Sequence, residues 1–112
     1  MSAAHTPSDQ TIFHPRRADL DLVEILRALA DPTRLEIVRI LAADATGEVA
    51  CGGFGIEATK QNLSHHFRVL REAGVIASRD EGRNRYSSLR RADLEARFPG
   101  LLVGVLGKRP AR

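Results

Sequence analysis

The segment from residue 60 to 76, KQNLSHHFRVLREAGVI, has the clearest pattern of hydrophobic and polar positions in the chain. Its apolar residues recur at spacings of three and four, which places them on one face of a helix. Gly74 stands where a helix takes a left-handed residue after its last turn. The pattern therefore predicts a helix that ends at Ala73. The residues of its buried face are Leu63, Phe67, Leu70 and Ala73.

The opposite face of this helix carries hydrogen-bond donors, and no acidic residue occurs before Glu72. A basic, donor-rich helix face suits the major groove of DNA, where base edges present acceptors. A solvated helix face with no ligand is the alternative. The residues assigned to DNA on this face are Lys60, Gln61, Asn62, Ser64, His65, Arg68 and Arg71.

A β-hairpin is predicted directly after this helix. Residues 75–79 and 84–89 favour strands and flank Asp80-Glu81-Gly82-Arg83, in which the glycine supplies the positive φ of a turn. A recognition-type helix followed by a hairpin is the order of elements in a winged helix. Arg83 and Arg85 at the tip are expected to reach the minor groove or the adjacent phosphates.

Two blocks of sequence resemble the ArsR/SmtB winged-helix repressors. The stretch LSHHFRVLREAGVI at 63–76 is similar to the recognition helix of that family, and ALADPTRLEIV at 28–38 is similar to its second-helix signature. The blocks lie at the separation expected for the family, and the likeness covers roughly residues 20 to 106. The resemblance implies a dimeric DNA-binding regulator.

Helical patterns also occupy the first half of the chain. One helix is expected from Asp19 to Ala30, and a second from Pro32 to Ala43, with Asp31 as its N-cap. Between 48 and 56, three glycines in four positions oppose a regular helix, so one or two short turns are expected there. Thr59 is the predicted N-cap of the recognition helix.

Residues 93–106 form an amphipathic segment that Pro99-Gly100 must kink or divide. This segment either closes the core of the monomer or pairs with the first helix across a two-fold axis, as in the resembled family. The pairing would place two recognition helices one turn of DNA apart, on a palindromic operator. The residues assigned to the dimer interface are Leu20, Val23, Leu94, Phe98, Leu101, Leu102 and Val105.

The predicted fold class is mainly α with a small β-hairpin, a winged helix-turn-helix. Its elements follow the order helix, helix, short helix, helix, strand, strand, helix. Residues 1–18 are expected to be a flexible N-terminal arm, 19–107 the DNA-binding and dimerisation domain, and 108–112 a basic tail.

Charge is unevenly distributed along these 112 residues. Eight basic and three acidic side chains lie between residues 60 and 91, whereas three basic and eight acidic side chains lie between 19 and 58. The basic half coincides with the proposed DNA-reading half, where counterion release favours binding. A single cysteine excludes an internal disulfide, and the absence of a membrane segment or signal peptide indicates a cytoplasmic protein.

Neither metal site that the resemblance implies is intact. Soft-metal sensors of the family carry a Cys-x-Cys pair at positions that here are Ala50 and Gly52, on either side of Cys51. Sensors of zinc, nickel or cobalt carry paired Asp and His ligands on the last helix, which here has Asp93 and no histidine. No metal or other cofactor is therefore expected.

The weak candidates for a non-standard nickel or zinc site are His5, His14 and Cys51, with Asp9 as a further ligand. In the alternative, Cys51 is a small buried residue and the two histidines are incidental. His65 and His66 point about 100° apart on a helix and cannot chelate as a pair. We expect His65 to face DNA and His66 to be partly buried.

The sequence predicts a homodimeric, sequence-specific regulator of transcription that binds double-stranded DNA. A metal-responsive repressor with a non-standard site, and a winged helix used mainly for binding proteins, remain as alternatives. An accessory protein partner also stays open. No enzyme is expected, because nothing orients Cys51 and a histidine as a catalytic pair.

Overall fold

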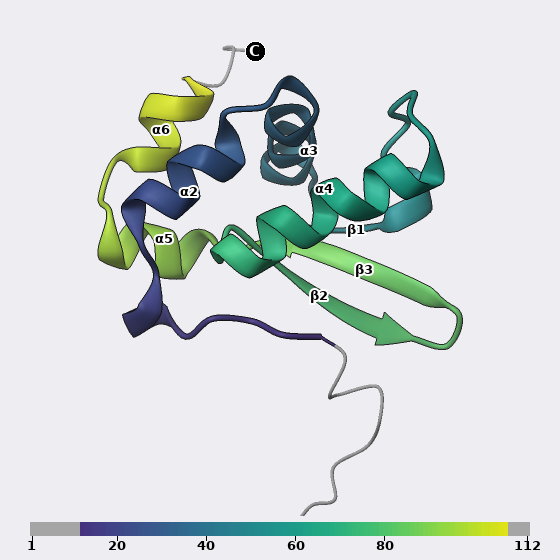
Figure 1. Ribbon diagram of the computed structural model, residues 1–112, viewed down its shortest axis with the longest axis horizontal. Helices are drawn as coiled ribbons and strands as arrows, with labels where there is room; N and C mark the ends of the chain where they lie inside the picture. The colour runs from purple at the N-terminus through teal and green to yellow at the C-terminus, as the bar shows by residue number, and fades with distance from the viewer. Residues whose placement is uncertain (1–11, 108–112) are drawn as a thin grey trace, which may run out of the picture.

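The computed structural model describes residues 12–107, which form a winged helix with five α-helices and a three-stranded antiparallel sheet (Figure 1). The helices are α2 (Leu22–Leu29), α3 (Pro32–Ala43), α4 (Lys60–Ala73), α5 (Arg91–Arg97) and α6 (Leu101–Leu106). The strands are β1 (Glu48–Ala50), β2 (Ile76–Glu81) and β3 (Asn84–Leu89), in the order β1-β3-β2. Helices α2, α5 and α6 lie at the end opposite the wing tip. The predicted fold class is confirmed.

Local capping sets the ends of the two central helices where the sequence predicts them. The Asp31 side chain accepts a hydrogen bond from the backbone N–H of Arg34 at 3.0 Å, and Pro32 begins α3. Thr59 caps α4 in the same way, through the N–H of Asn62 at 3.1 Å. Gly74 ends α4 with φ of 89°, as expected of a left-handed C-terminal residue.

The segment between α3 and α4 combines a confirmed turn with an unexpected strand. A short 3-10 turn, η2 (Cys51–Gly53), is the turn that the glycines indicate. Strand β1 was not predicted, because only three residues pair with β3 and their pattern is too short to signal a strand. Phe54 is buried beyond this turn, with its ring centroid 5.1 Å from that of Phe67.

The hairpin turn is tighter than expected. Cross-strand pairing continues through Asp80 with Arg85 and Glu81 with Asn84, so only Gly82 and Arg83 form the turn. The predicted four-residue turn is therefore wrong by two residues, Asp80 and Glu81, which belong to the first strand. At the C-terminal end, the predicted division at Pro99-Gly100 is confirmed by the separation of α5 from α6.

The N-terminal boundary of the folded part needs correction. Helix α2 begins at Leu22, since Asp21 caps it, and a 3-10 turn, η1 (Arg17–Asp19), precedes it. Residues 12–16 belong to the fold as well, because His14 and Pro15 are hydrogen-bonded to the sheet and to Arg90. The flexible arm was predicted to extend to residue 18. Residues 1–11 and the predicted basic tail, 108–112, lie outside the described residues.

A single hydrophobic core joins the helices to the inner face of the sheet. Leu20, Leu94 and Leu102 are each at most 4% exposed within this core. Their assignment to the dimer interface is therefore corrected, since they pack inside one chain. Within residues 12–107, no helix is long and apolar enough to cross a membrane. The other buried apolar residues are Ile25, Ala28, Leu29, Ile37, Val38, Leu41, Phe54, Phe67, Leu70, Val75 and Ile76.

A substitution of Gly74 tests the packing at the end of α4. A Cβ built on Gly74 would lie 2.1 Å from Cδ2 of Leu20, and the left-handed backbone is itself strained for alanine. Gly74→Ala should lower the free energy of unfolding by about 2–4 kcal/mol in urea denaturation.

Gly104→Ala is the matched control for this substitution. Gly104 lies within α6, where an added Cβ meets nothing within 4 Å. Because alanine favours a helix over glycine, this variant should be unchanged or more stable by up to about 1 kcal/mol. Equal unfolding free energies for the two variants would contradict the described packing.

Candidate nucleic-acid interface

Helix α4 separates its buried and exposed residues as the sequence predicts. Phe67 and Leu70 are at most 5% exposed, and both face the core. Their burial leaves the donor-bearing side chains on the outer face, where a duplex can reach them. The exposed residues of this face are Lys60, Gln61, Asn62, Ser64, His65 and Arg68.

Arg71 does not belong to this exposed face. It is 8% exposed, and its Nε has no hydrogen-bond partner among residues 12–107. Burial lowers the pKa of Arg71, and the positive charge of Arg85 acts in the same direction. The prediction that Arg71 contacts DNA is therefore corrected for this conformation. Arg71 follows Phe67 by four residues, so the helical period places it beside the buried apolar face of α4, and this spacing could have identified it.

The two adjacent histidines have different surroundings, as expected. His65 is exposed, and its Nδ1 lies 3.5 Å from Nη2 of Arg68. His66 is half-buried, and its Nδ1 lies 3.2 Å from Nη1 of Arg34 on α3. His65 therefore remains available to a ligand of the outer face, whereas His66 is occupied within the protein.

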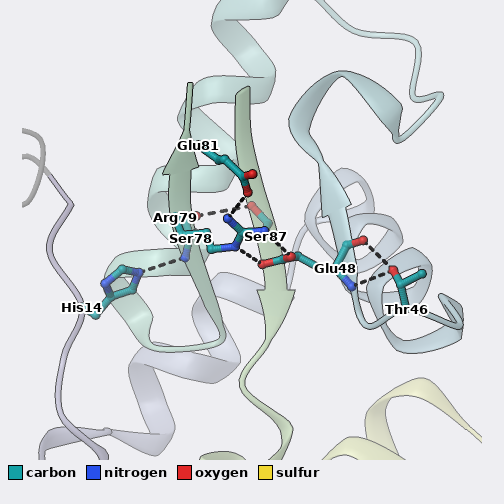
Figure 2. A network of polar contacts seen from close by, with 7 residues as sticks. All are labelled: His14, Thr46, Glu48, Ser78, Arg79, Glu81 and Ser87. Carbon is teal, nitrogen blue, oxygen red and sulfur yellow. Dashed lines mark hydrogen bonds and ion pairs between the residues drawn. The ribbon is translucent and has the colours of Figure 1, made fainter. Parts of the chain in front are cut away.

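The outer face of the wing is braced by Arg79 (Figure 2). Its guanidinium donates to both carboxylate oxygens of Glu48 at 2.7 and 2.9 Å and to Glu81 at 2.6 Å. It also lies 4.8 Å from the centroid of the Tyr86 ring. Hydrogen bonding from Arg79 lowers the pKa of Glu48, and the two carboxylates raise the pKa of Arg79. These contacts connect all three strands and engage Arg79 within the protein.

The inner face of the wing engages a second arginine. Arg85 donates to both oxygens of Asp80 at 2.7 and 3.1 Å, and this contact lowers the pKa of Asp80. Arg85 is therefore a half-buried partner of Asp80, and the expected contact with DNA would require this ion pair to open. Arg83 is exposed at the turn, and no ion pair joins it to another residue between 12 and 107. Arg83 is the wing arginine best placed for a phosphate.

The candidate metal ligands are dispersed or already engaged. Nε2 of His14 accepts a hydrogen bond from the backbone N–H of Ser78 at 2.9 Å (Figure 2). Burial lowers the pKa of His14, and the charges of Arg71, Arg90 and Arg85 add to this effect. These surroundings disfavour a cation at His14.

Cys51 is half-buried, with Sγ 4.0 Å from Oγ of Ser87. Burial raises the pKa of its thiol, which disfavours the thiolate that binds metals. In the part of the chain from residue 12 to 107, no three His, Cys, Asp or Glu side chains form a group able to hold a metal ion. His5 and Asp9 lie outside the described residues.

Three polar positions in this region were not identified from the sequence. Glu48 braces the wing through Arg79, and the hydroxyls of Ser78 and Ser87 lie 3.3 Å apart inside the sheet. The alternation of residues in a strand could have placed Ser78 on the inner face with Ile76. Glu48 carried no comparable signal, because its role depends on the pairing of β1 with β3.

Comparison with known proteins agrees with this arrangement. A family model described as a helix-turn-helix domain matches residues 29–79, the part from the end of α2 to β2. YceK of Bacillus subtilis, a helix-turn-helix-type transcriptional regulator, is 40% identical over 81 residues, which are 70% of this chain and 80% of YceK.

Two solved structures extend the likeness to the whole winged helix. The transcriptional repressor BigR of Xylella fastidiosa is 25% identical, with a TM-score of 0.59 over 94% of this chain and all of BigR. A structure titled as a possible transcriptional regulator for arsenical resistance is 32% identical, with a TM-score of 0.56 over 77% of this chain and 91% of its own. With its capped recognition helix and its wing, the chain belongs to the ArsR/SmtB family of winged-helix transcriptional regulators, which bind DNA.

Proposed function

We propose that this regulator acts in the cytoplasm as a homodimer that binds a palindromic operator and represses transcription. The observation that carries the proposal is the exposed, donor-rich face of α4, which has no acidic residue between Lys60 and Arg68. Gln61 and Ser64 on this face can read base edges, while Lys60 and Arg68 contact phosphates. Repression is inferred by analogy with BigR, which is a transcriptional repressor.

An exposed apolar surface supports the homodimer. Leu22, Val23 and Leu26 on α2 are 41%, 54% and 44% exposed, and Val103 on α6 is 59% exposed. Both helices lie at the end of the molecule opposite the wing (Figure 1). Burial of these side chains against a second copy would remove apolar surface from water and leave both recognition helices accessible.

The dimer surface proposed here differs in part from the one expected from the sequence. Val23 remains in it, and Leu22, Leu26 and Val103 join it. Phe98, Leu101 and Val105 are half-buried, and they can contribute their remaining exposed area at its edge.

A winged helix that binds only proteins is the second class of function considered for this fold. Such a surface would be expected to carry apolar or acidic side chains on α4 in place of donors. The exposed face from Lys60 to Arg68 favours DNA. An accessory protein could still bind elsewhere on the regulator, and the proposed function requires no catalytic residue.

Base readout by α4 can be tested with a duplex selected by the protein from a random library. Gln61→Ala and Ser64→Ala should each weaken binding to the selected duplex by about 1–3 kcal/mol, with little effect on a random duplex of equal length. Arg68→Ala should weaken both, since a phosphate contact carries no sequence information. Fluorescence anisotropy measures these affinities. Equal losses on both duplexes for Gln61→Ala and Ser64→Ala would contradict base readout.

The wing should contribute through charge, and mostly through Arg83. For a dimer that contacts about 6–10 phosphates, the plot of log K against log salt concentration should have a slope of about −5 to −9. Arg83→Ala should weaken binding to all sequences and make this slope shallower by about 2, because each subunit loses one phosphate contact.

Arg39→Ala is the matched control for charge, because Arg39 is an exposed arginine on α3, outside the wing. Its slope should equal that of the unsubstituted protein. A slope near zero for the unsubstituted protein would contradict nucleic-acid binding, and equal slopes for Arg83→Ala and the unsubstituted protein would remove Arg83 from the interface.

Metal ions should not change operator affinity appreciably. His14 is bonded to Ser78 and surrounded by arginines, and Cys51 is half-buried with a raised pKa. Titration of the selected duplex with and without saturating nickel or zinc should give affinities within threefold of each other, below the coupling of about 1–3 kcal/mol that regulation needs. A tenfold shift that Cys51→Ser or His14→Ala abolishes would establish a metal-responsive repressor instead.

A further inference from the structure

One polar cluster joins the helix with the exposed apolar face to the helix that reads DNA. Nε of Arg34, in the first turn of α3, donates to the carbonyl oxygen of Ala28 at 2.6 Å, and Nη2 donates to that of Arg27 at 3.5 Å. These carbonyls belong to the last turn of α2, where a cation is favourable. Nη1 of the same side chain lies 3.2 Å from Nδ1 of His66 on α4.

The hydrogen bond between Arg34 and His66 can have only one donor. A guanidinium has only donors, so Nδ1 of His66 must accept, and the imidazole carries its proton on Nε2. Asp31, which caps α3, has Oδ2 3.9 Å from the same Nδ1. The His66 side chain is 18% exposed, so the contact is largely shielded from water.

The position of His66 makes this contact relevant to DNA recognition. His66 lies near the middle of α4, between the exposed His65 and the buried Phe67. Helices α2, α3 and α4 pack against one another, and within residues 12–107 Arg34 is the side chain that bonds to both α2 and α4. A change in this contact therefore alters one of the bonds that connect α4 to α2 through α3.

We propose that Arg34 and His66 are positioning residues that set the orientation of the recognition helix relative to α2, and thereby the spacing between half-sites that the dimer prefers. The inference rests on the proposed homodimer, in which α2 lies at the interface. If one face of α2 is fixed against the partner, the angle between α2 and α4 determines where each recognition helix meets the duplex.

A pair of His66 variants separates positioning from general stability. His66→Asn retains an acceptor, because Oδ1 of asparagine can take the place of Nδ1, whereas His66→Leu removes the acceptor and keeps an apolar side chain. Neither variant removes the hydrogen bonds of Arg34 with α2, whereas Arg34→Ala would remove them and could prevent folding. Arg39→Ala, which removes an exposed arginine from the same helix α3, is the control for charge.

The experiment compares four duplexes in fluorescence anisotropy, with thermal unfolding of each variant measured in parallel. They are the duplex selected by the unsubstituted protein, versions with one base pair added or removed between the half-sites, and a random duplex. His66→Leu should bind the selected duplex about three- to thirtyfold more weakly. The ratio of its affinity for the selected duplex to its affinity for the duplexes of altered spacing should decrease. Its affinity for the random duplex should stay within twofold of that of the unsubstituted protein. His66→Asn and Arg39→Ala should keep the spacing preference of the unsubstituted protein.

Three results would overturn the inference. A folded His66→Leu variant with an unchanged spacing preference would show that the contact does not position α4. Equal losses on the selected and random duplexes would show that it serves stability alone. If the unsubstituted protein selects a single half-site, the proposed homodimer fails and the spacing inference fails with it. If the unsubstituted protein selects two half-sites and the variants keep its spacing preference, only the inference about Arg34 and His66 is overturned.

Discussion

The burial of Phe67 and Leu70 is the constraint on which the rest of the structure depends. Both side chains lie in the core, so helix α4 has one rotation about its axis in which its apolar face is covered. That rotation directs Gln61, Ser64 and Arg68 outward. Hydrophobic packing therefore determines which polar groups are available to DNA, although it makes no contact with DNA itself.

Much of the fold could be predicted because its central signals are local. Asp31 and Thr59 each cap a helix through residues three positions away, and Gly74 provides the left-handed conformation that ends α4. Gly82, which supplies the positive φ of the turn, also placed the hairpin. What the sequence could not show depends on partners distant along the chain, such as β3 for the short strand β1 and Ser78 for His14.

The sequence predicted which face of α4 is exposed, but it did not predict which arginines are free to contact DNA. An arginine count treats every cation between 60 and 91 as available to DNA, but Arg79 and Arg85 are engaged by carboxylates and Arg71 is buried. The pairs of Arg79 with Glu48 and of Arg85 with Asp80 join residues of different strands, so no periodicity along the chain reveals them. Fewer cations of the wing and of α4 are therefore free to attract DNA than the count along the sequence indicates.

Chemical-shift mapping of the isotope-labelled protein with its selected duplex tests the central claim most directly, since it reports which surface the DNA covers. We predict the largest changes for the backbone and side-chain N–H groups of the exposed α4 residues and for the turn at Arg83. The exposed α4 residues are Lys60, Gln61, Asn62, Ser64, His65 and Arg68. Small changes are expected for the buried residues Phe67 and Leu70 and for the apolar surface of α2. Changes concentrated on α2 and α6, with α4 unaffected, would contradict the account.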